Sequence, residues 1–160
     1  PIIIDEHLKK MMQSRYEDAK KEKIIIGGMT KIIEAILDKG EIVAAKSTIE
    51  VFGGDFDKRI LLAILNSKLM TFYYRLYYNS SSLEGGFYSI NREQIENLPI
   101  KYIEDNNYEQ LYFMIEKYII DYDMNIKNEI DNYIYDLYGL TNEERKIINN
   151  YFITNSLFKD

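Results

Sequence analysis

The strongest helical pattern in the chain lies between residues 57 and 78, where large apolar side chains recur every three or four positions. The residues that carry this pattern are Leu61, Leu65, Leu69, Phe72 and Leu76. Their spacing predicts one long helix with a single buried face, and Asp57 is typical of its N-cap. The serines at 80–82 favour a turn, so we expect a polar loop over residues 79–91. A short helical turn then leads to Pro99.

Upstream of this helix the pattern is first helical and then typical of strands. Asp5 to Glu22 predicts an N-terminal helix, with apolar and basic residues on different sides. Short apolar runs follow at residues 23–26, 31–37, 41–45 and 47–52, and they predict strands between about 23 and 52. Because the turns at Gly27-Gly28 and at Asp38-Lys39-Gly40 are short, these strands should pair antiparallel in one sheet.

Downstream of Pro99 the helical pattern returns. Residues 107–122 and 126–137 each carry one apolar face, and Gly139 is a typical stop for the second helix. Thr141 and Glu144 have capping-box spacing and predict the start of a further helix. We therefore predict a mixed α/β (α+β) fold, in which a small, mainly antiparallel sheet is packed by the long helix and followed by a helical C-terminal tail. The predicted division is a domain over residues 1–104 and a tail over 105–160.

Composition limits the class of protein. A chain of 160 residues with 46% hydrophobic residues can form one domain with a sizeable core. The absence of cysteine excludes disulfides and thiolate metal sites, and it indicates a cytoplasmic protein. No apolar run reaches the roughly 18 residues of a membrane span. The chain begins at Pro1 with no signal-peptide pattern and no initiator methionine, and the missing methionine leads us to expect a piece of a longer protein.

The net charge of −6 is distributed unevenly. Residues 1–60 hold 11 basic and 11 acidic residues, and residues 61–100 hold 3 of each. Residues 101–160 hold 6 basic and 12 acidic residues, so all the excess acid lies in the tail. A neutral first part can still present a basic face to a polyanion, whereas the acidic tail should avoid phosphates.

One segment mimics a metal site. Asp121, Asp123 and Asn125 have the spacing that begins a calcium loop. Such a loop also needs glycine at its sixth position and glutamate at its twelfth, where this chain has Ile126 and Asn132. A calcium site is therefore not expected, and the lone His7 has no neighbouring partner that would indicate catalysis or metal binding.

The central segment also resembles a known family. Leu61-Leu62-Ala63-Ile64-Leu65-Asn66-Ser67, then Phe72-Tyr73-Tyr74, a glycine-containing loop and Leu98-Pro99-Ile100 resemble the TaqI-like specificity domain. Domains of that family recognise the target site for adenine-specific DNA methyltransferases and for fused restriction-modification enzymes. Related domains form the specificity subunits of type I restriction systems. The resemblance implies that this chain recognises specific double-stranded DNA for a type II or type I enzyme.

The resemblance places catalysis elsewhere in the parent protein. Adenine methylation in such enzymes uses an Asn/Asp-Pro-Pro-aromatic motif and a glycine-rich cofactor loop. The chain has two prolines, Pro1 and Pro99, and its glycine pairs lack methyl-donor spacing. We therefore expect this piece not to be an enzyme and to hold no cofactor. The parent would be a DNA adenine-N6 methyltransferase that uses S-adenosylmethionine, with magnesium and endonuclease activity if it also cleaves DNA. The expected partners are double-stranded DNA and the catalytic domain or methyltransferase subunit, with no membrane.

The loop after the long helix is the strongest candidate for DNA contact, because Asn, Ser and Arg side chains bind base edges and phosphates. The candidates in and beside it are Arg75, Asn79, Ser80, Ser81, Ser82, Tyr88, Ser89, Asn91 and Arg92. We expect the arginines to contact phosphates, and Asn79, the serines and Asn91 to approach base edges. Lys31 and Lys46 on the strand-rich part are further candidates. Two alternatives stay open: a subunit-docking module with acidic helices, and an enzyme whose site the sequence does not reveal.

Overall fold

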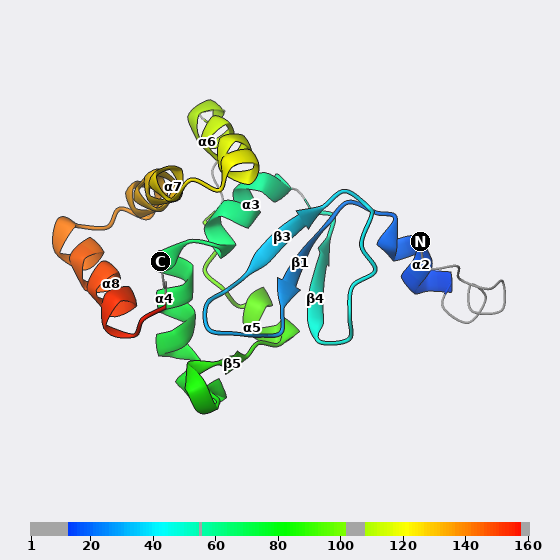
Figure 1. The fold of residues 1–160 in the computed structure, drawn as a ribbon, viewed down its shortest axis with the longest axis horizontal. Coiled ribbons are helices and arrows are strands. Elements are labelled where there is room, and N and C mark those ends of the chain that lie inside the picture. Colours follow the sequence, from blue (N-terminus) through cyan, green and yellow to red (C-terminus); the bar gives the residue numbers. More distant parts are fainter. Residues whose placement is uncertain (1–12, 55, 102–107, 158–160) are drawn as a thin grey trace.

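The computed structural model describes residues 13–54, 56–101 and 108–157. It has the predicted mixed architecture, with a small antiparallel sheet beside a set of helices and a helical C-terminal region (Figure 1). No helix in these ranges is long and apolar enough to cross a membrane. The strands are β1 (Lys23–Gly27), β2 (Met29–Thr30), β3 (Ala35–Asp38), β4 (Thr48–Phe52) and β5 (Tyr88–Ser89). The α-helices are α2 (Gln13–Ala19), α3 (Lys58–Leu65), α4 (Lys68–Tyr77), α5 (Arg92–Glu96), α6 (Glu109–Asp121), α7 (Met124–Leu137) and α8 (Asn142–Thr154).

The sheet has β1 at its centre, with β3 on one side and β4 on the other, all antiparallel. Ile24 and Ile26 of β1 are fully buried, and they lie opposite residues of both neighbouring strands. Ile25, which faces the other side of the sheet, is also buried, so a run of three isoleucines suits a central strand with both faces covered. The prediction that residues 23–52 form one antiparallel sheet is therefore confirmed for β1, β3 and β4, while β2 pairs separately with β5.

Two details of the predicted sheet are wrong. The turn at Asp38-Lys39-Gly40 does not join paired strands, because β3 and β4 lie on opposite sides of β1. Residues 41–45 form no strand. The cause is the buried carboxylate of Asp38, which accepts hydrogen bonds from the N–H groups of Glu41 and Ile42. The same carboxylate forms an ion pair with Lys23 Nζ at 2.5 Å. These bonds turn the chain away from the sheet, as short acidic side chains commonly do.

The predicted single helix over 57–78 is also wrong, because it is broken at Asn66 and Ser67 into α3 and α4. Asp57 is the N-cap of α3, as predicted, and Ser67 is the N-cap of α4, where its hydroxyl accepts the N–H of Met70. Asn66 Oδ1 accepts the N–H of Ala35, 2.8 Å away, and its Nδ2 donates to the carbonyl of Ala35 at 2.9 Å. Polar side chains that bind neighbouring backbone groups disfavour a continuous helix, and here they join it to the edge of the sheet.

The break changes which face of the second half is buried. The predicted face continued through Leu69 and Phe72 to Leu76, but Leu76 is 56% exposed. The buried residues of α4 are instead Met70, Thr71, Tyr74 and Arg75. Because a new helix starts at Ser67, its rotation follows the contacts of α4 rather than the spacing set by α3. Thr71 illustrates these contacts, since its hydroxyl accepts the N–H of Ile33 in the β2–β3 connection at 3.0 Å.

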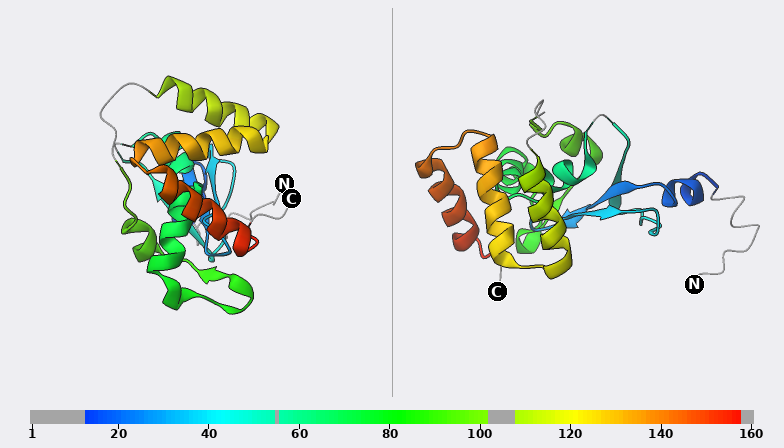
Figure 2. Two further views of the ribbon diagram at one scale, coloured as in Figure 1. Left: turned by 90° about the vertical axis from the view of Figure 1, so that its left-hand side faces the viewer. Right: turned by 90° about the horizontal axis from the view of Figure 1, so that it is seen from above.

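The C-terminal helices pack against the sheet-bearing part. Asp131 of α7 accepts the backbone N–H of Lys68 at the start of α4 and pairs with Lys127 at 2.8 Å, so the carboxylate joins α7 to the helix break. The predicted capping box of Thr141 and Glu144 begins α8, and Gly139 before it has the positive φ of +70° that suits a helix end. Figure 2 shows these helices along one side of the molecule. Residues from both predicted parts share one core cluster, and the predicted boundary at 104–105 lies outside the described residues.

The N-terminal helix is described from Gln13 and ends at Ala19, three residues earlier than predicted. A turn follows, in which the N–H groups of Lys20 and Lys21 bind the carbonyls of Glu17 and Asp18. The part of the predicted helix before Gln13, including His7, lies outside the described residues.

Candidate nucleic-acid interface

Three segments that are distant in sequence meet at one end of the sheet. They are residues 28–31 after β1, residues 46–48 before β4, and the 79–91 segment after α4. Gly28 joins them, because its N–H donates to the carbonyl of Ser47 and its own carbonyl accepts the N–H of Ile90, both at 2.9 Å. A Cβ at this position would lie 2.2 Å from the Ser47 oxygen, so the approach requires glycine. The pairing of β2 with β5 continues the junction.

The 79–91 segment is folded rather than open. Ser82 and Tyr88 form an antiparallel bridge, and the N–H of Leu83 donates to the carbonyl of Phe87 at 2.7 Å. Gly85 and Gly86 make the turn between them with φ values of +76° and +79°, which suit glycine. In the left view of Figure 2 this green segment extends beyond α4 at the lower end of the molecule. It therefore forms a projecting hairpin that adds to β2.

Arg75 supports this hairpin from inside. Its residue is 7% exposed, and Nη1 donates to the carbonyls of Lys31 at 2.6 Å and Gly86 at 3.0 Å. Nε donates to the hydroxyl of Tyr151 at 3.0 Å, and the guanidinium lies 4.6 Å from the centre of the Tyr88 ring. The planar guanidinium suits several acceptors at fixed angles. The structure thus gives the Arg75 guanidinium several partners within the protein, and it makes Arg75 the link between α4, the residue after β2, the hairpin and α8.

A second buried network holds the base of the hairpin. Gln94 of α5 is 8% exposed, and its Oε1 accepts the Tyr74 hydroxyl at 2.7 Å and the Asn91 N–H at 3.0 Å. Its Nε2 donates to Ser81 Oγ at 2.7 Å. Burial raises the pKa of Tyr74 to about 12, so its hydroxyl stays protonated and able to donate. Sequence reasoning missed Gln94, although Asn91 and Gln94 have capping-box spacing and do form that box.

These networks divide the eleven predicted contact residues into two groups. The side chains that bond within the protein are Arg75, Asn79, Ser81, Tyr88 and Asn91. The exposed residues outside these networks are Lys31, Lys46, Ser80, Ser82, Ser89 and Arg92, while Asn79 and Asn91 are exposed and also bond within the protein. Lys46 directly precedes Ser47, which binds Gly28, so it lies at the same end of the sheet. The Arg92 side chain is 83% exposed and pairs with Glu96 at 2.6 Å.

The outer surface of the hairpin and β2 carries apolar side chains that sequence reasoning missed. Met29 is 62% exposed, Leu83 41% and Phe87 39%. Lys31 stands among them, with its ammonium 5.3 Å from the centre of the Phe87 ring. The alternation of exposed Phe87 and Ser89 with buried Tyr88 and Ile90 would have indicated this surface, because neighbouring strand residues face opposite sides.

Comparison with known protein families gives this geometry its context. The model of the TaqI-like C-terminal specificity domain matches residues 2–100, which include the sheet, α3, α4, the hairpin and α5. The chain belongs to this family. As a TaqI-like specificity domain it is a DNA-recognition domain of methyltransferase-type enzymes. No curated protein matches the chain.

All eleven candidate residues of this TaqI-like domain lie within the matched range, whereas α6, α7 and α8 lie outside it. Among the described residues, no group of three or more His, Asp or Glu side chains is arranged to hold a metal ion. Asp123, from the calcium-like spacing, is the N-cap of α7 and accepts the N–H of Asn125 at 2.8 Å.

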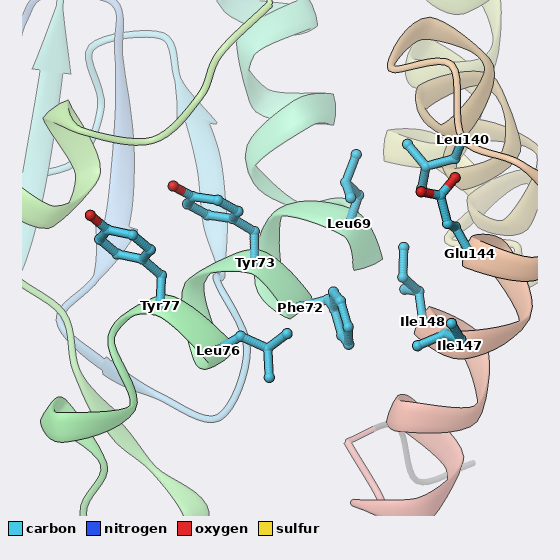
Figure 3. A pocket seen from close by; sticks show the side chains of 9 residues that line it. All are labelled: Leu69, Phe72, Tyr73, Leu76, Tyr77, Leu140, Glu144, Ile147 and Ile148. Carbon is cyan, nitrogen blue, oxygen red and sulfur yellow. The ribbon is translucent and has the colours of Figure 1, made fainter.

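An apolar groove of about 560 Å³ lies between α4 of the matched range and α8 (Figure 3). Its lining residues are Leu69, Phe72, Tyr73, Leu76, Tyr77, Leu140, Glu144, Ile147 and Ile148. Leu76, Tyr77 and Ile147 are each more than half exposed. The rings of Tyr73 and Tyr77 stack at 5.5 Å along one wall. This groove is the second surface with functional potential, and it is acidic at Glu144 rather than basic.

Proposed function

We propose that this domain selects a specific double-stranded DNA sequence for an adenine-N6 methyltransferase, either fused to it in a type II enzyme or assembled with it in a type I system. The observation that carries the proposal is the hairpin of residues 79–91, which projects from the family-matched part and is held by two buried networks. Recognition requires side chains kept in fixed positions, and a rigid helix behind a loop provides such support.

The proposed contacts are the exposed candidates whose side chains lie outside the two buried networks. Lys31, Lys46 and Arg92 are exposed cations and suit phosphate oxygens, which position a protein on DNA without reading its sequence. The exposed hydroxyls are Ser80, Ser82 and Ser89. A hydroxyl both donates and accepts, so these serines suit base edges. Arg75, Tyr88, Asn79, Ser81 and Asn91 are proposed to position the hairpin.

Catalysis is proposed to reside in a separate part of the enzyme, together with S-adenosylmethionine and, if the enzyme cleaves, magnesium. The glycines here do not suit a methyl-donor loop. The space beside Gly28 is filled by the Ser47 carbonyl, and a Cβ added at Gly27 would lie 2.8 Å from the Thr30 side chain. We expect no binding of S-adenosylmethionine in calorimetry with the purified chain. Binding with a micromolar dissociation constant would contradict this division of labour.

Selection from a random pool of duplexes tests the recognition proposal. We expect the purified chain to enrich one defined sequence motif. A variant with alanine at Ser80, Ser82 and Ser89 should keep its thermal midpoint and accept more bases at one or more positions. Ser14→Ala, at an exposed serine on α2, is the matched control and should leave the motif unchanged. Failure of the wild-type chain to enrich any motif would overturn the function, and an unchanged motif in the triple variant would remove the serines from the contact surface.

The groove between α4 and α8 supports a second candidate function, docking of the methyltransferase part. Exposed Leu76, Tyr77 and Ile147 suit the apolar face of a partner helix. The tail holds twice as many acidic as basic residues, which favours a partner with basic flanks. Leu76→Asp should reduce co-purification with the methyltransferase part without changing the thermal midpoint. Equal recovery of the complex would contradict this role.

A further inference from the structure

We propose that the outer surface of the hairpin and β2 reads the C5-methyl groups of thymines in the major groove, with Phe87 as the principal contact. We call this surface the ribbon face and define it by Met29, Lys31, Leu83, Phe87 and Ser89. The inference deepens the proposed function and rests on it, because it names what part of a DNA site the domain would read.

The register of the strands places these side chains together. Met29 lies opposite Ser89 and Thr30 opposite Tyr88, so Lys31 continues toward Phe87, in agreement with the 5.3 Å from its ammonium to that ring. On the other side of the hairpin, the backbone bond from Leu83 to Phe87 makes these two residues neighbours. Tyr88, which lies between Phe87 and Ser89 in the sequence, is 4% exposed. Because successive strand residues face opposite sides, Phe87 and Ser89 point outward.

Three of the five side chains of the ribbon face are apolar, where a base-reading surface would ordinarily offer hydrogen bonds. Met29, Leu83 and Phe87 cannot pair with donors or acceptors on base edges. In the major groove, thymine presents a C5-methyl group, to which apolar side chains can pack, beside its O4 acceptor. That groove is about 12 Å wide and admits a two-stranded ribbon. An apolar ribbon face therefore fits thymine-containing base pairs.

The charges around the ribbon face agree with base contact. Lys31 supplies a cation that suits a flanking phosphate. Glu84 is exposed at the hairpin turn, and phosphates would repel it. A carboxylate can instead accept the N4 amino group of cytosine at the base edges. The glycines at 85 and 86 add no side chains to the turn, so the backbone there can approach the bases closely.

Replacing thymine by deoxyuridine removes one methyl group and leaves base pairing intact. A methyl group buried on binding contributes about 0.8 kcal/mol, which corresponds to about a fourfold change in affinity. We would measure the dissociation constants of the purified chain on its selected duplex and on duplexes with deoxyuridine at each thymine in turn. We expect about fourfold weaker binding at one or more positions.

Phe87→Ala connects this effect to the protein. It should bind the thymine duplex more weakly than wild type and should lose the difference between thymine and deoxyuridine at those positions. Leu76→Ala is the control, because Leu76 is also an exposed apolar residue but lies in the groove between α4 and α8. It should retain the wild-type difference. Met29→Ala is a second test variant, since the 62% exposure of Met29 makes its truncation harmless to the core.

The outcomes separate this inference from the function on which it rests. If the chain enriches no motif, the proposed function and the inference both fail. If it enriches a motif but binds every deoxyuridine duplex as tightly as the thymine duplex, the inference alone is overturned. Equal thymine discrimination in wild type, Phe87→Ala and Met29→Ala would also overturn it. Weaker binding of Phe87→Ala with unchanged discrimination would show a general or protein-docking role for this surface.

Discussion

Truncation of Arg75 should destabilise the fold and leave the salt dependence of DNA binding unchanged. The guanidinium donates to the carbonyls of Lys31 and Gly86 and to the Tyr151 hydroxyl. A hydrogen bond from a charged donor contributes about 1.5 kcal/mol at the low end of its range, so three such bonds contribute about 4.5 kcal/mol. After truncation, water can reach some of the freed carbonyl and hydroxyl groups and replace part of the lost hydrogen bonding. We therefore expect Arg75→Ala to lower the free energy of unfolding by about 3 kcal/mol.

The DNA measurement distinguishes a positioning residue from a phosphate contact. Loss of one phosphate contact reduces the slope of log K against log salt concentration by about 0.9. Because the Arg75 guanidinium is occupied inside the protein, we expect Arg75→Ala to weaken binding through a less ordered hairpin at an unchanged slope. The assays are urea unfolding and fluorescence-anisotropy titrations of a duplex at several salt concentrations below the unfolding range.

Arg92→Ala is the matched control for this measurement. Its side chain is exposed and makes a surface ion pair with Glu96, a kind of pair that contributes about 0–1 kcal/mol. We expect little loss of stability and a slope reduced by about 0.9. The reasoning would be refuted if the free energy of unfolding of Arg75→Ala lay within about 0.5 kcal/mol of the wild-type value, which is a typical surface effect. It would also be refuted if Arg75→Ala showed the change in salt slope that we expect for Arg92→Ala.

Three further predictions follow from the packing. Asp38→Asn leaves Lys23 buried without its counter-charge and should cost about 3–5 kcal/mol in urea unfolding at neutral pH. Burial alone would raise the pKa of Asp38, but bonds from Lys23 and two backbone N–H groups outweigh it and lower that pKa. The stabilisation is therefore complete above the ordinary carboxyl pKa of about 4, and the difference between variant and wild type should shrink as the pH falls through the lower folded pKa. Asn66→Ala removes both bonds to Ala35 and should cost about 2 kcal/mol, and Asn66→Asp should cost at least as much, because it sets a carboxylate oxygen against the Ala35 carbonyl; equal stability of all three chains in thermal unfolding would contradict this. Glu143→Lys, in the acidic tail, should leave the selected DNA motif unchanged while non-specific affinity rises, and an altered motif would show that the tail reads bases.

Elements governed by neighbouring residues were predictable from the sequence. The run Ile24 to Ile26 is a strand, Asp57 caps a helix, and Thr141 with Glu144 begins another. Each depends on local periodicity or on a cap whose partners lie within four residues. The fold class follows from these elements and is confirmed.

The helix break at Asn66 was not predictable from the pattern, because the partners that favour it are distant in sequence. The amide binds Ala35, and the next turn is fixed by Asp131, 63 residues beyond Lys68. The apolar pattern therefore appeared continuous across a break made by tertiary hydrogen bonds.

The candidate site shows the same limit. Composition indicated the 79–91 segment, and the choice of contact residues within it stays a prediction. What the sequence could not distinguish was which polar side chains face solvent. Arg75 is bonded inside the protein, while Arg92 is almost fully exposed. Arg75 lies among tyrosines and Leu76 in the sequence, but the bonds that bury its guanidinium arise only when Lys31, Gly86 and Tyr151 converge.

The pairing of Asn66 with Ala35 also bears on self-association. An outer strand presents unpaired N–H and carbonyl groups that can template pairing with another copy, the first step of strand-mediated aggregation. β3 is such a strand, and the Asn66 amide occupies both outward groups of Ala35 at its start. An incoming strand would have to displace that amide before its ladder could begin there. The same side chain that interrupts the helix therefore also protects the domain from self-association at high concentration. Loss of Asn66 exposes a strand edge at which copies of the chain can pair.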